Sequence, residues 1–249
     1  MNGRRARAAW VMGKFPVTKS GKQMLKNNQL ISKYHAKLNE AKSDDSGSRD
    51  GIIGELGGFE AYQAASLYGT KHGDTSKWFL KEFKHHRNPG KIYRLLDVGA
   101  LAHNYAACGS WCQPMGIDLR PLIPGIQRAN FLDWQPAEAF DIICLSLVLN
   151  FVGDPRQRGR MLRKAWENLC GDGFLFVVLP RSCIDHSRFV TLDYFVGLMS
   201  FIGFEMLKQH SSRKLSYFLL RKARSSLGVK QPEEPNLKAG GFNNFKIKL

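Results

Sequence analysis

The feature that most constrains the fold is a series of short apolar runs separated by polar and helical segments. Each run is continuously apolar, which is typical of parallel strands that are covered on both faces. The runs occupy residues 92–98 (IYRLLDV), 114–119 (PMGIDL), 140–149 (FDIICLSLVL) and 173–180 (GFLFVVLP). Strands that alternate with helices form a mostly parallel sheet with helices on its faces, so we expect an α/β fold.

The second half of the chain adds a helix and a different ending. Residues 154–173 predict a helix with Pro155 near its start and Gly171 as its C-cap. Beyond it the pattern predicts a helix, a strand, a tight polar turn over His210–Lys214 and a final strand. A C-terminal antiparallel hairpin on a mostly parallel sheet departs from the dehydrogenase pattern.

Composition divides the chain into four parts. Residues 1–52 form a basic N-terminal arm, with an amphipathic helix over about 20–40 and a polar linker, and residues 53–93 form a helical N-terminal extension. Residues 94–224 form the ligand-binding domain. Residues 225–249 form a tail that either docks or stays mobile.

Charge and cysteine content narrow the classes of partner. The 249 residues carry a formal net charge of +16, which favours a polyanionic partner, RNA before others, although a solvated basic surface is an alternative. Two basic clusters, at 156–164 and 210–215, are candidates for phosphate contacts. The alternative for the first cluster is a solvated helix face.

No apolar run approaches the roughly 18 residues of a membrane span. Five cysteines without paired spacing predict reduced thiols and no metal site.

The turn after the first strand, RLLDVGALAH, contains a single glycine, Gly99. Dinucleotide-binding turns carry several glycines so that backbone can approach a pyrophosphate. S-adenosylmethionine (SAM) has no phosphate, so one glycine suffices for it. Asp118 ends the second strand 19 residues later, where a carboxylate can accept hydrogen bonds from two ribose hydroxyls. A tight turn and a helix cap are the structural alternatives for Gly99 and Asp118 taken singly. The presence of both at neighbouring strand ends favours SAM.

Other strand ends supply further candidates, because ligands of open α/β sheets bind at the carboxyl ends of strands. Asp97 precedes the glycine turn, and Asp133 follows a possible third strand ending at 130–133, where it could meet an adenine amino group or belong to a surface loop. Asn150 and Phe151 follow the fourth strand, where a methyl acceptor would lie; a core role for Phe151 is the alternative.

Several strings together resemble a known family: LLDVGAL, GIDLRP, FDIICLSLVLNFV, DPRQRGRML, GDGFLFVVLP and a C-terminal NNF. They are similar to the fungal 25S ribosomal RNA adenine-N1 methyltransferases, whose metazoan relatives act as SAM sensors in nutrient signalling. The similarity extends from about Gly21 to the end of the chain. It implies a Rossmann-like class I methyltransferase fold, a location in the nucleus and nucleolus, and cofactor contacts at Gly99 and Asp118.

The resemblance therefore implies a role in rRNA processing and ribosome biogenesis. We expect an RNA-binding methyltransferase that modifies N1 of an adenine in large-subunit rRNA or a pre-ribosomal particle, acting as a monomer. Asn150 and Phe151 are the candidates for the base pocket. The alternative from another class is a non-catalytic SAM sensor that docks on a protein complex.

Overall fold

The structure, a computed structural model, describes residues 75–223, 228–235 and 242–249. The predicted N-terminal arm (1–52) and the first part of the predicted helical extension lie outside these residues. Helix α4 (Ser76–Phe83) opens the described part, followed by strands β1 (Tyr93–Val98), β2 (Cys112–Asp118), β3 (Ile126–Arg128) and β4 (Phe140–Ser146). Then come α5 (Pro155–Glu167), β5 (Leu169–Pro180), α6 (Ser182–Asp185), α7 (Leu192–Ile202), β6 (Phe204–Ser211) and β7 (Leu215–Lys222).

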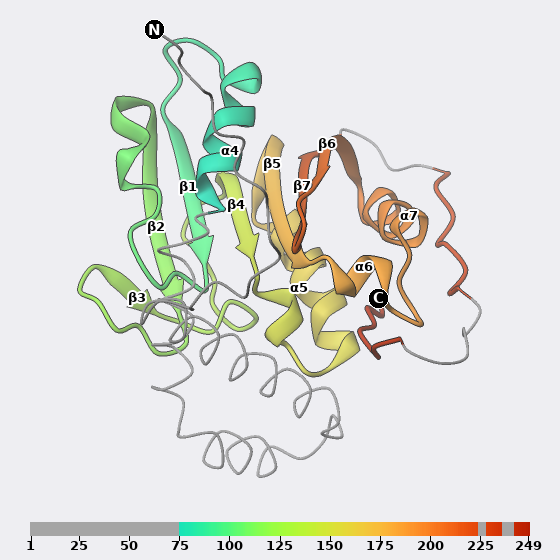
Figure 1. The fold of residues 1–249 in the computed structure, drawn as a ribbon. Helices are drawn as coiled ribbons and strands as arrows, with labels where there is room; N and C mark the ends of the chain where they lie inside the picture. The colour runs from blue at the N-terminus through green and yellow to red at the C-terminus, as the bar shows by residue number, and fades with distance from the viewer. Residues whose placement is uncertain (1–74, 224–227, 236–241) are drawn as a thin grey trace, which may run out of the picture.

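The strands form one sheet of seven, in the order β3-β2-β1-β4-β5-β7-β6 (Figure 1). β1 to β5 pair in parallel, whereas β7 pairs antiparallel with both β5 and β6. From β1 the chain adds β2 and β3 on one side of the sheet, and it then adds β4 and β5 on the other side of β1. Ligands of open α/β sheets bind at such a point, where the strand order reverses. The predicted mostly parallel sheet with a C-terminal antiparallel hairpin is confirmed.

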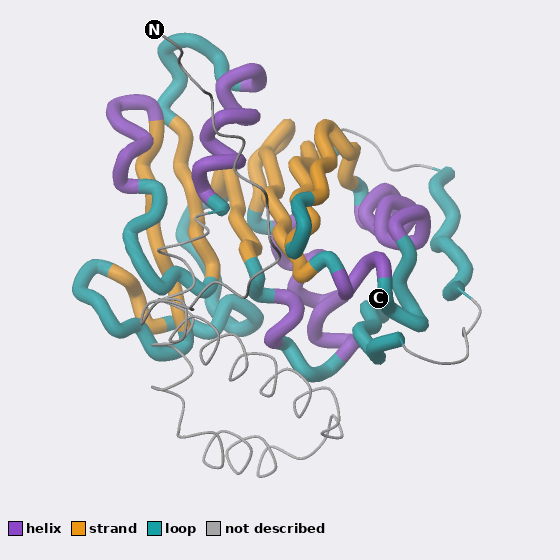
Figure 2. The backbone as a smooth tube through the Cα atoms, in the orientation of Figure 1, coloured by secondary structure: helices purple, strands orange, loops and turns teal. Residues whose placement is uncertain are grey.

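Apolar side chains cover both faces of the sheet, as continuous apolar strands require. On one face, α4 packs Phe79 and Phe83, each with no exposed surface, against Tyr93, Phe174 and Phe176 of the strands. The other face lies beneath α5, α6 and α7, whose buried residues Leu162, Ile184 and Leu198 belong to its core. Figure 2 shows the strands between these helices. The aromatic residues of α4 therefore seal this face of the sheet.

Helix α5 begins as predicted and ends differently. Asp154 caps it by accepting the Arg156 N–H at 2.8 Å, and Pro155 lies in its first turn. The predicted C-cap at Gly171 is wrong, because α5 ends at Glu167 and Gly171 lies inside β5. No glycine is needed there, since the Lys222 ammonium donates to the carbonyls of Trp166 and Leu169. The predicted polar turn is shorter, Ser212–Lys214, because β6 continues through His210 and Ser211.

The C-terminal residues 242–249 are docked, which the sequence left open. Phe245 and Ile247 are buried in the core beneath α5 and α7. The Lys248 N–H donates to the Pro155 carbonyl at 2.9 Å, and a Cβ at Gly159 would lie 1.9 Å from the Lys248 carbonyl oxygen. Gly159 is therefore the position where the C-terminal segment comes into close contact with α5.

Candidate active site

The turn after β1 is built around Gly99. Its φ is +72°, a conformation that favours glycine, and a Cβ there would lie 2.9 Å from Cγ2 of Val148. The N–H groups of Gly99 and Ala100 both donate to the Ile117 carbonyl, at 2.8 and 3.0 Å. Because these two amides already bind β2, they are not presented to a phosphate group. The turn thus brings backbone close to β4 without forming a phosphate cradle.

Asp118 ends β2 beside this turn. Its Oδ1 accepts the Arg120 N–H at 2.7 Å, and its carbonyl accepts the Ala129 N–H at 2.9 Å. Burial raises the pKa of the Asp118 carboxyl, and the Arg120 hydrogen bond opposes that rise. Asp118 is therefore a half-buried carboxylate held in place at the carboxyl edge of the sheet, next to the Gly99 turn.

The chain after β4 makes a strained turn over the same edge. Leu147 has a φ of +58°, although it is not a glycine, and its N–H donates to the Val178 carbonyl at 2.9 Å. A short 3-10 helix, Leu149–Phe151, follows and contains both candidates for the base pocket. Asn150 is 4% exposed, whereas Phe151 is half-buried. The structure thus brings Gly99 to this segment through Val148, while the roles of Asn150 and Phe151 stay predictions.

Arg158 of α5 supports this segment, and sequence reasoning missed it. The residue is 1% exposed, and its guanidinium donates to the carbonyls of Leu149, Val152 and Lys246. The same guanidinium lies 4.5 Å from the centre of the Phe245 ring. Arg158 therefore ties the turn after β4 to the docked C-terminal residues. In the sequence it lies within a basic run and has no signal that separates it from its neighbours.

The predicted phosphate-binding role of the cluster at 156–164 is accordingly wrong for two of its members. Arg158 and Lys164 are both buried, and the Lys164 ammonium donates to the Leu132 carbonyl at 3.1 Å. The reason is physical: α5 lies on the core, so the basic residues on its inner face must satisfy backbone carbonyls. Arg156 and Arg163 remain exposed.

Helix α4 joins the site at its first turn. The hydroxyls of Thr75 and Ser146 lie 2.7 Å apart, and Ser76 donates to the Asn104 carbonyl at 3.2 Å. These contacts attach the start of α4 to the end of β4 and to the loop after β1. The sequence offered no signal for a contact between residues this far apart.

The two remaining candidates lie in different places. Asp97 is 7% exposed and occupies β1 directly before the Gly99 turn, paired in register with Gly116 and Cys144. Asp133 is exposed in a turn and pairs with Arg160 of α5 at 3.3 Å. β3 ends at Arg128, so the expected strand end at 130–133 is wrong. The proposed contact of Asp133 with an adenine group stays a prediction.

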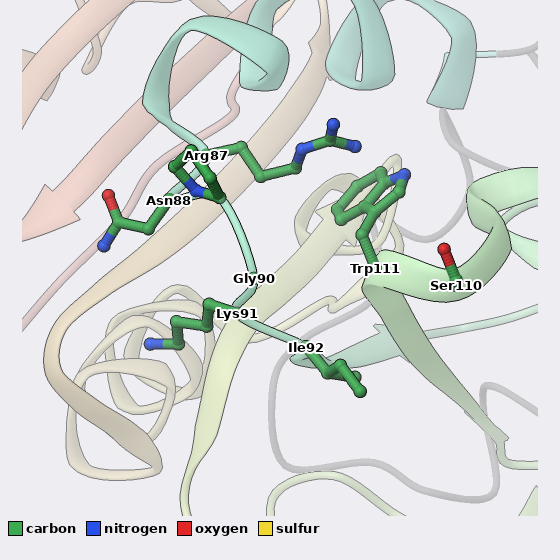
Figure 3. Close-up of a pocket in the computed structure, with 8 residues that line it drawn as sticks. Arg87, Asn88, Gly90, Lys91, Ile92, Ser110 and Trp111 are labelled. Carbon is green, nitrogen blue, oxygen red and sulfur yellow. The ribbon is translucent and has the colours of Figure 1, made fainter.

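Two hollows lie at the opposite, amino edge of the sheet. One of about 250 Å³ lies between Arg87 and Trp111, with the guanidinium carbon 4.9 Å from the ring centre (Figure 3). The second, of about 740 Å³, is lined by Lys91, Asp172 and Arg221 among others. Neither hollow includes the Gly99 turn, Asp118 or the segment after β4.

The residues at the carboxyl edge fit SAM. A Cβ at Gly99 would enter the space next to Val148, and the half-buried Asp118 carboxylate suits hydroxyl groups. The amides of the turn already donate to the Ile117 carbonyl, which suits a ligand without phosphates.

Within residues 75–223, 228–235 and 242–249, no group of three or more His, Cys, Asp or Glu side chains could hold a metal ion. The same residues include no helix long and apolar enough to cross a membrane.

Comparison with known proteins places these features in a family. Residues 49–247 match the family model of "25S rRNA (adenine(2142)-N(1))-methyltransferase, Bmt2". A Saccharomyces cerevisiae protein named 25S rRNA (adenine(2142)-N(1))-methyltransferase is 32% identical, over 89% of this chain and 72% of its own length. A Schizosaccharomyces pombe 25S rRNA adenine-N(1) methyltransferase is also 32% identical, over 78% of this chain and 80% of its own.

More distant similarities agree with the fold. A Xenopus tropicalis protein named S-adenosylmethionine sensor upstream of mTORC1 is 24% identical over 53% of this chain and 39% of its own length. The crystal structure of a SAM-dependent methyltransferase from Clostridium acetobutylicum superposes with a TM-score of 0.51 at 10% identity, covering 65% of this chain and 98% of that one. The predicted class I methyltransferase fold is confirmed.

Proposed function

Because the chain belongs to the 25S rRNA (adenine(2142)-N(1))-methyltransferase family, we propose that it transfers the methyl group of SAM to N1 of an adenine in large-subunit rRNA. The structural observation that carries this proposal is the Gly99 turn, whose amides bind Ile117 and whose missing side chain keeps the edge next to Val148 open. SAM supplies an electrophilic methyl group on a sulfonium.

The chain has little acid or base chemistry to perform in this reaction. Adenine N1 has a lone pair in the ring plane, so it needs no prior loss of a proton. As the bond from N1 to the methyl carbon formed, the sulfur–methyl bond would break, S-adenosylhomocysteine would leave and the positive charge would pass to the base. Alignment of the two reactants then accounts for most of the rate enhancement. The segment after β4 is held by Leu147, by the Thr75–Ser146 contact and by Arg158, so its position is fixed before substrate arrives.

The target base has to be presented unpaired, because N1 lies on the Watson–Crick edge. Phe151 is half-buried at the carboxyl edge and can offer a ring to the face of the base. Asn150 is nearly buried, which suits a polar group at the floor of such a pocket. Both belong to the 3-10 helix that Arg158 holds through the Leu149 carbonyl.

The acidic residues are assigned to the cofactor. We expect Asp118 to accept hydrogen bonds from the ribose hydroxyls, and Asp97 to support the Gly99 turn from its buried position in β1. Asp133 is proposed to meet the adenine amino group, although its ion pair with Arg160 must then open.

Transfer of tritiated methyl from SAM to isolated large-subunit rRNA tests the proposal. The wild-type protein should label the RNA, whereas Asn150→Ala and Phe151→Ala should lower labelling at least about tenfold if they lose roughly 1.4 kcal/mol of base contact. Asn244→Ala and Phe201→Ala, at an exposed and a half-buried position elsewhere, are matched controls that should label normally. Unchanged labelling by both pocket variants would refute the base pocket.

Binding of SAM without labelling of any RNA would instead favour the sensor alternative, the function printed in the name of the Xenopus relative. We also propose that the protein acts as a monomer, in the nucleolus, on rRNA or a pre-ribosomal particle. Sedimentation of the purified protein and fluorescence of a tagged copy test the first two points. Labelling of naked rRNA against purified pre-ribosomes tests the third.

A further inference from the structure

Three aromatic rings from three different elements gather on the face of the sheet that α4 covers. The Trp78 ring of α4 is stacked on His210 of β6, with centres 6.0 Å apart and planes at 12°. Tyr217 of β7 lies 5.3 Å from Trp78 and 5.6 Å from His210. The inner side of Trp78 is stacked on Phe176 at 5.8 Å. We call Trp78, His210 and Tyr217 the aromatic platform.

The platform reaches solvent at its outer end. His210 is exposed, whereas Trp78 and Tyr217 are half-buried. β6 is the last strand in the sheet order, so His210 belongs to an edge strand. Lys208 pairs in register with Leu219 and His210 with Tyr217, which places both side chains on the α4 face. An exposed ring that is stacked on a second, fixed ring is a suitable surface for a flat π-system.

Unpaired positive charge lies on the elements that carry the platform, α4, β6 and the turn before β7. Five exposed cations, Lys77, Lys81, Lys208, Arg213 and Lys214, form no ion pair within the part of the chain that the structure describes. Residues 206–222 contain no acidic residue. At the amino edge, Lys91, Arg94 and Arg221 each pair with a carboxylate, and the Arg87 guanidinium lies over the Trp111 ring. A polyanion is therefore expected at the platform rather than at the amino edge.

The platform is also connected to the methyl-transfer site. Thr75, one turn before Trp78, contacts Ser146 at the end of β4. The turn between β6 and β7 is joined to the end of β5 by the Arg181 N–H, which donates to the Lys214 carbonyl at 2.8 Å. β4 and β5 are neighbouring parallel strands, so their ends lie at the same edge of the sheet. An RNA strand that leaves the proposed base pocket along this edge therefore meets the platform next.

We infer that the aromatic platform and its five cations bind an unpaired stretch of RNA next to the target adenine, with one base stacked on His210. The inference rests on the proposed function, because it assumes that RNA is the substrate. Stacking on an aromatic ring tolerates every base, and the cations contact phosphates. The platform would thus hold the flanking strand open, which N1 of the target requires.

The first test compares stacking variants in binding of a labelled single-stranded oligoadenylate of about 12 nucleotides, a length within the range that such sites occupy. His210→Ala should weaken binding by about tenfold, a typical loss for one stacked base. His210→Phe keeps a ring and should bind within about twofold of wild type. His86→Ala removes a histidine that lies against Phe174 at the amino edge, and it should have no effect. The same strand in a duplex should bind more weakly.

The second test concerns charge. Arg213→Ala removes one phosphate contact, so the slope of log K against log salt concentration should fall by about 0.7. Arg87→Ala, at the amino edge, is the matched control and should keep the wild-type slope. If Arg87→Ala lowered this slope and Arg213→Ala did not, the RNA would lie at the amino edge, and the platform would be refuted.

The outcomes separate the platform from the proposed function. If wild type labels rRNA and binds the oligonucleotide, yet His210→Ala and Arg213→Ala bind like wild type, the platform is refuted and the function stands. If wild type binds SAM and labels no RNA, the proposed function fails whatever these variants do. Selective loss of single-strand binding in His210→Ala, restored in His210→Phe, supports the platform.

Discussion

Replacement of Arg158 by methionine should destabilise the protein and loosen the segment after β4. Methionine is unbranched and fills much of the same volume, but it cannot donate to the carbonyls of Leu149, Val152 and Lys246. The Leu149 carbonyl keeps the Val152 N–H as a donor, so two carbonyls lose theirs. At about 1 kcal/mol for each, the free energy of unfolding should fall by about 2 kcal/mol. The guanidinium contact with Phe245 adds to that loss.

Urea denaturation of Arg158→Met and wild type measures this change directly. A loss of about 2 kcal/mol should also lower the melting temperature by about 4 to 8 °C in a domain of this size. Arg163→Met is the matched control, because Arg163 lies on the same helix and is exposed, and its effect should stay below about 0.5 kcal/mol. SAM affinity should fall in Arg158→Met and not in Arg163→Met. Equal stability of the two variants would refute the role given to Arg158.

Three further substitutions test other parts of the site. Gly99→Arg should abolish SAM binding, because φ is +72° and the new Cβ would lie 2.9 Å from Val148; normal affinity in calorimetry would contradict the site. Burial raises the folded-state pKa of Asp118, so its ionised form costs stability above that pKa and the cost disappears as pH falls through it. Asp118→Asn can still accept the Arg120 N–H, and it should therefore match or exceed wild-type stability at pH 7 while SAM affinity falls; loss of both would contradict this separation. Phe245→Ala should lower the free energy of unfolding by about 3 to 5 kcal/mol in urea denaturation, since the ring is 2% exposed, and a change below 1 kcal/mol would show that the C-terminal segment is not docked in solution.

The sequence predicted those parts of the fold that depend on local pattern. β1 to β5 except β3, helix α5 at its start and the C-terminal hairpin all follow from continuous apolar runs, a capped first turn and a polar turn. β3 was placed too late because it has three residues, too few for a recognisable pattern. The end of α5 was missed because Lys222, more than fifty residues away, donates to the Trp166 carbonyl in its last turn.

The same distinction between local pattern and distant contacts applies to the candidate site. Gly99 and Asp118 could be located because strand ends fix them, and the structure joins them through Ile117. Arg158 could not be located, because the residues that flank it in the sequence do not distinguish a buried arginine from an exposed one. The Thr75–Ser146 contact and the stacking of Trp78 on His210 depend on how α4 lies across the sheet, which the local sequence does not determine.

Nucleoside mass spectrometry can detect methylation of adenine N1 in large-subunit rRNA directly. Unmodified large-subunit rRNA would be incubated with the wild-type protein and SAM, digested to nucleosides and compared with a reaction containing Gly99→Arg. We expect N1-methyladenosine in the wild-type reaction and none with Gly99→Arg. Wild-type protein that binds SAM and leaves the rRNA free of N1-methyladenosine, or that methylates a different atom, would contradict the proposed function.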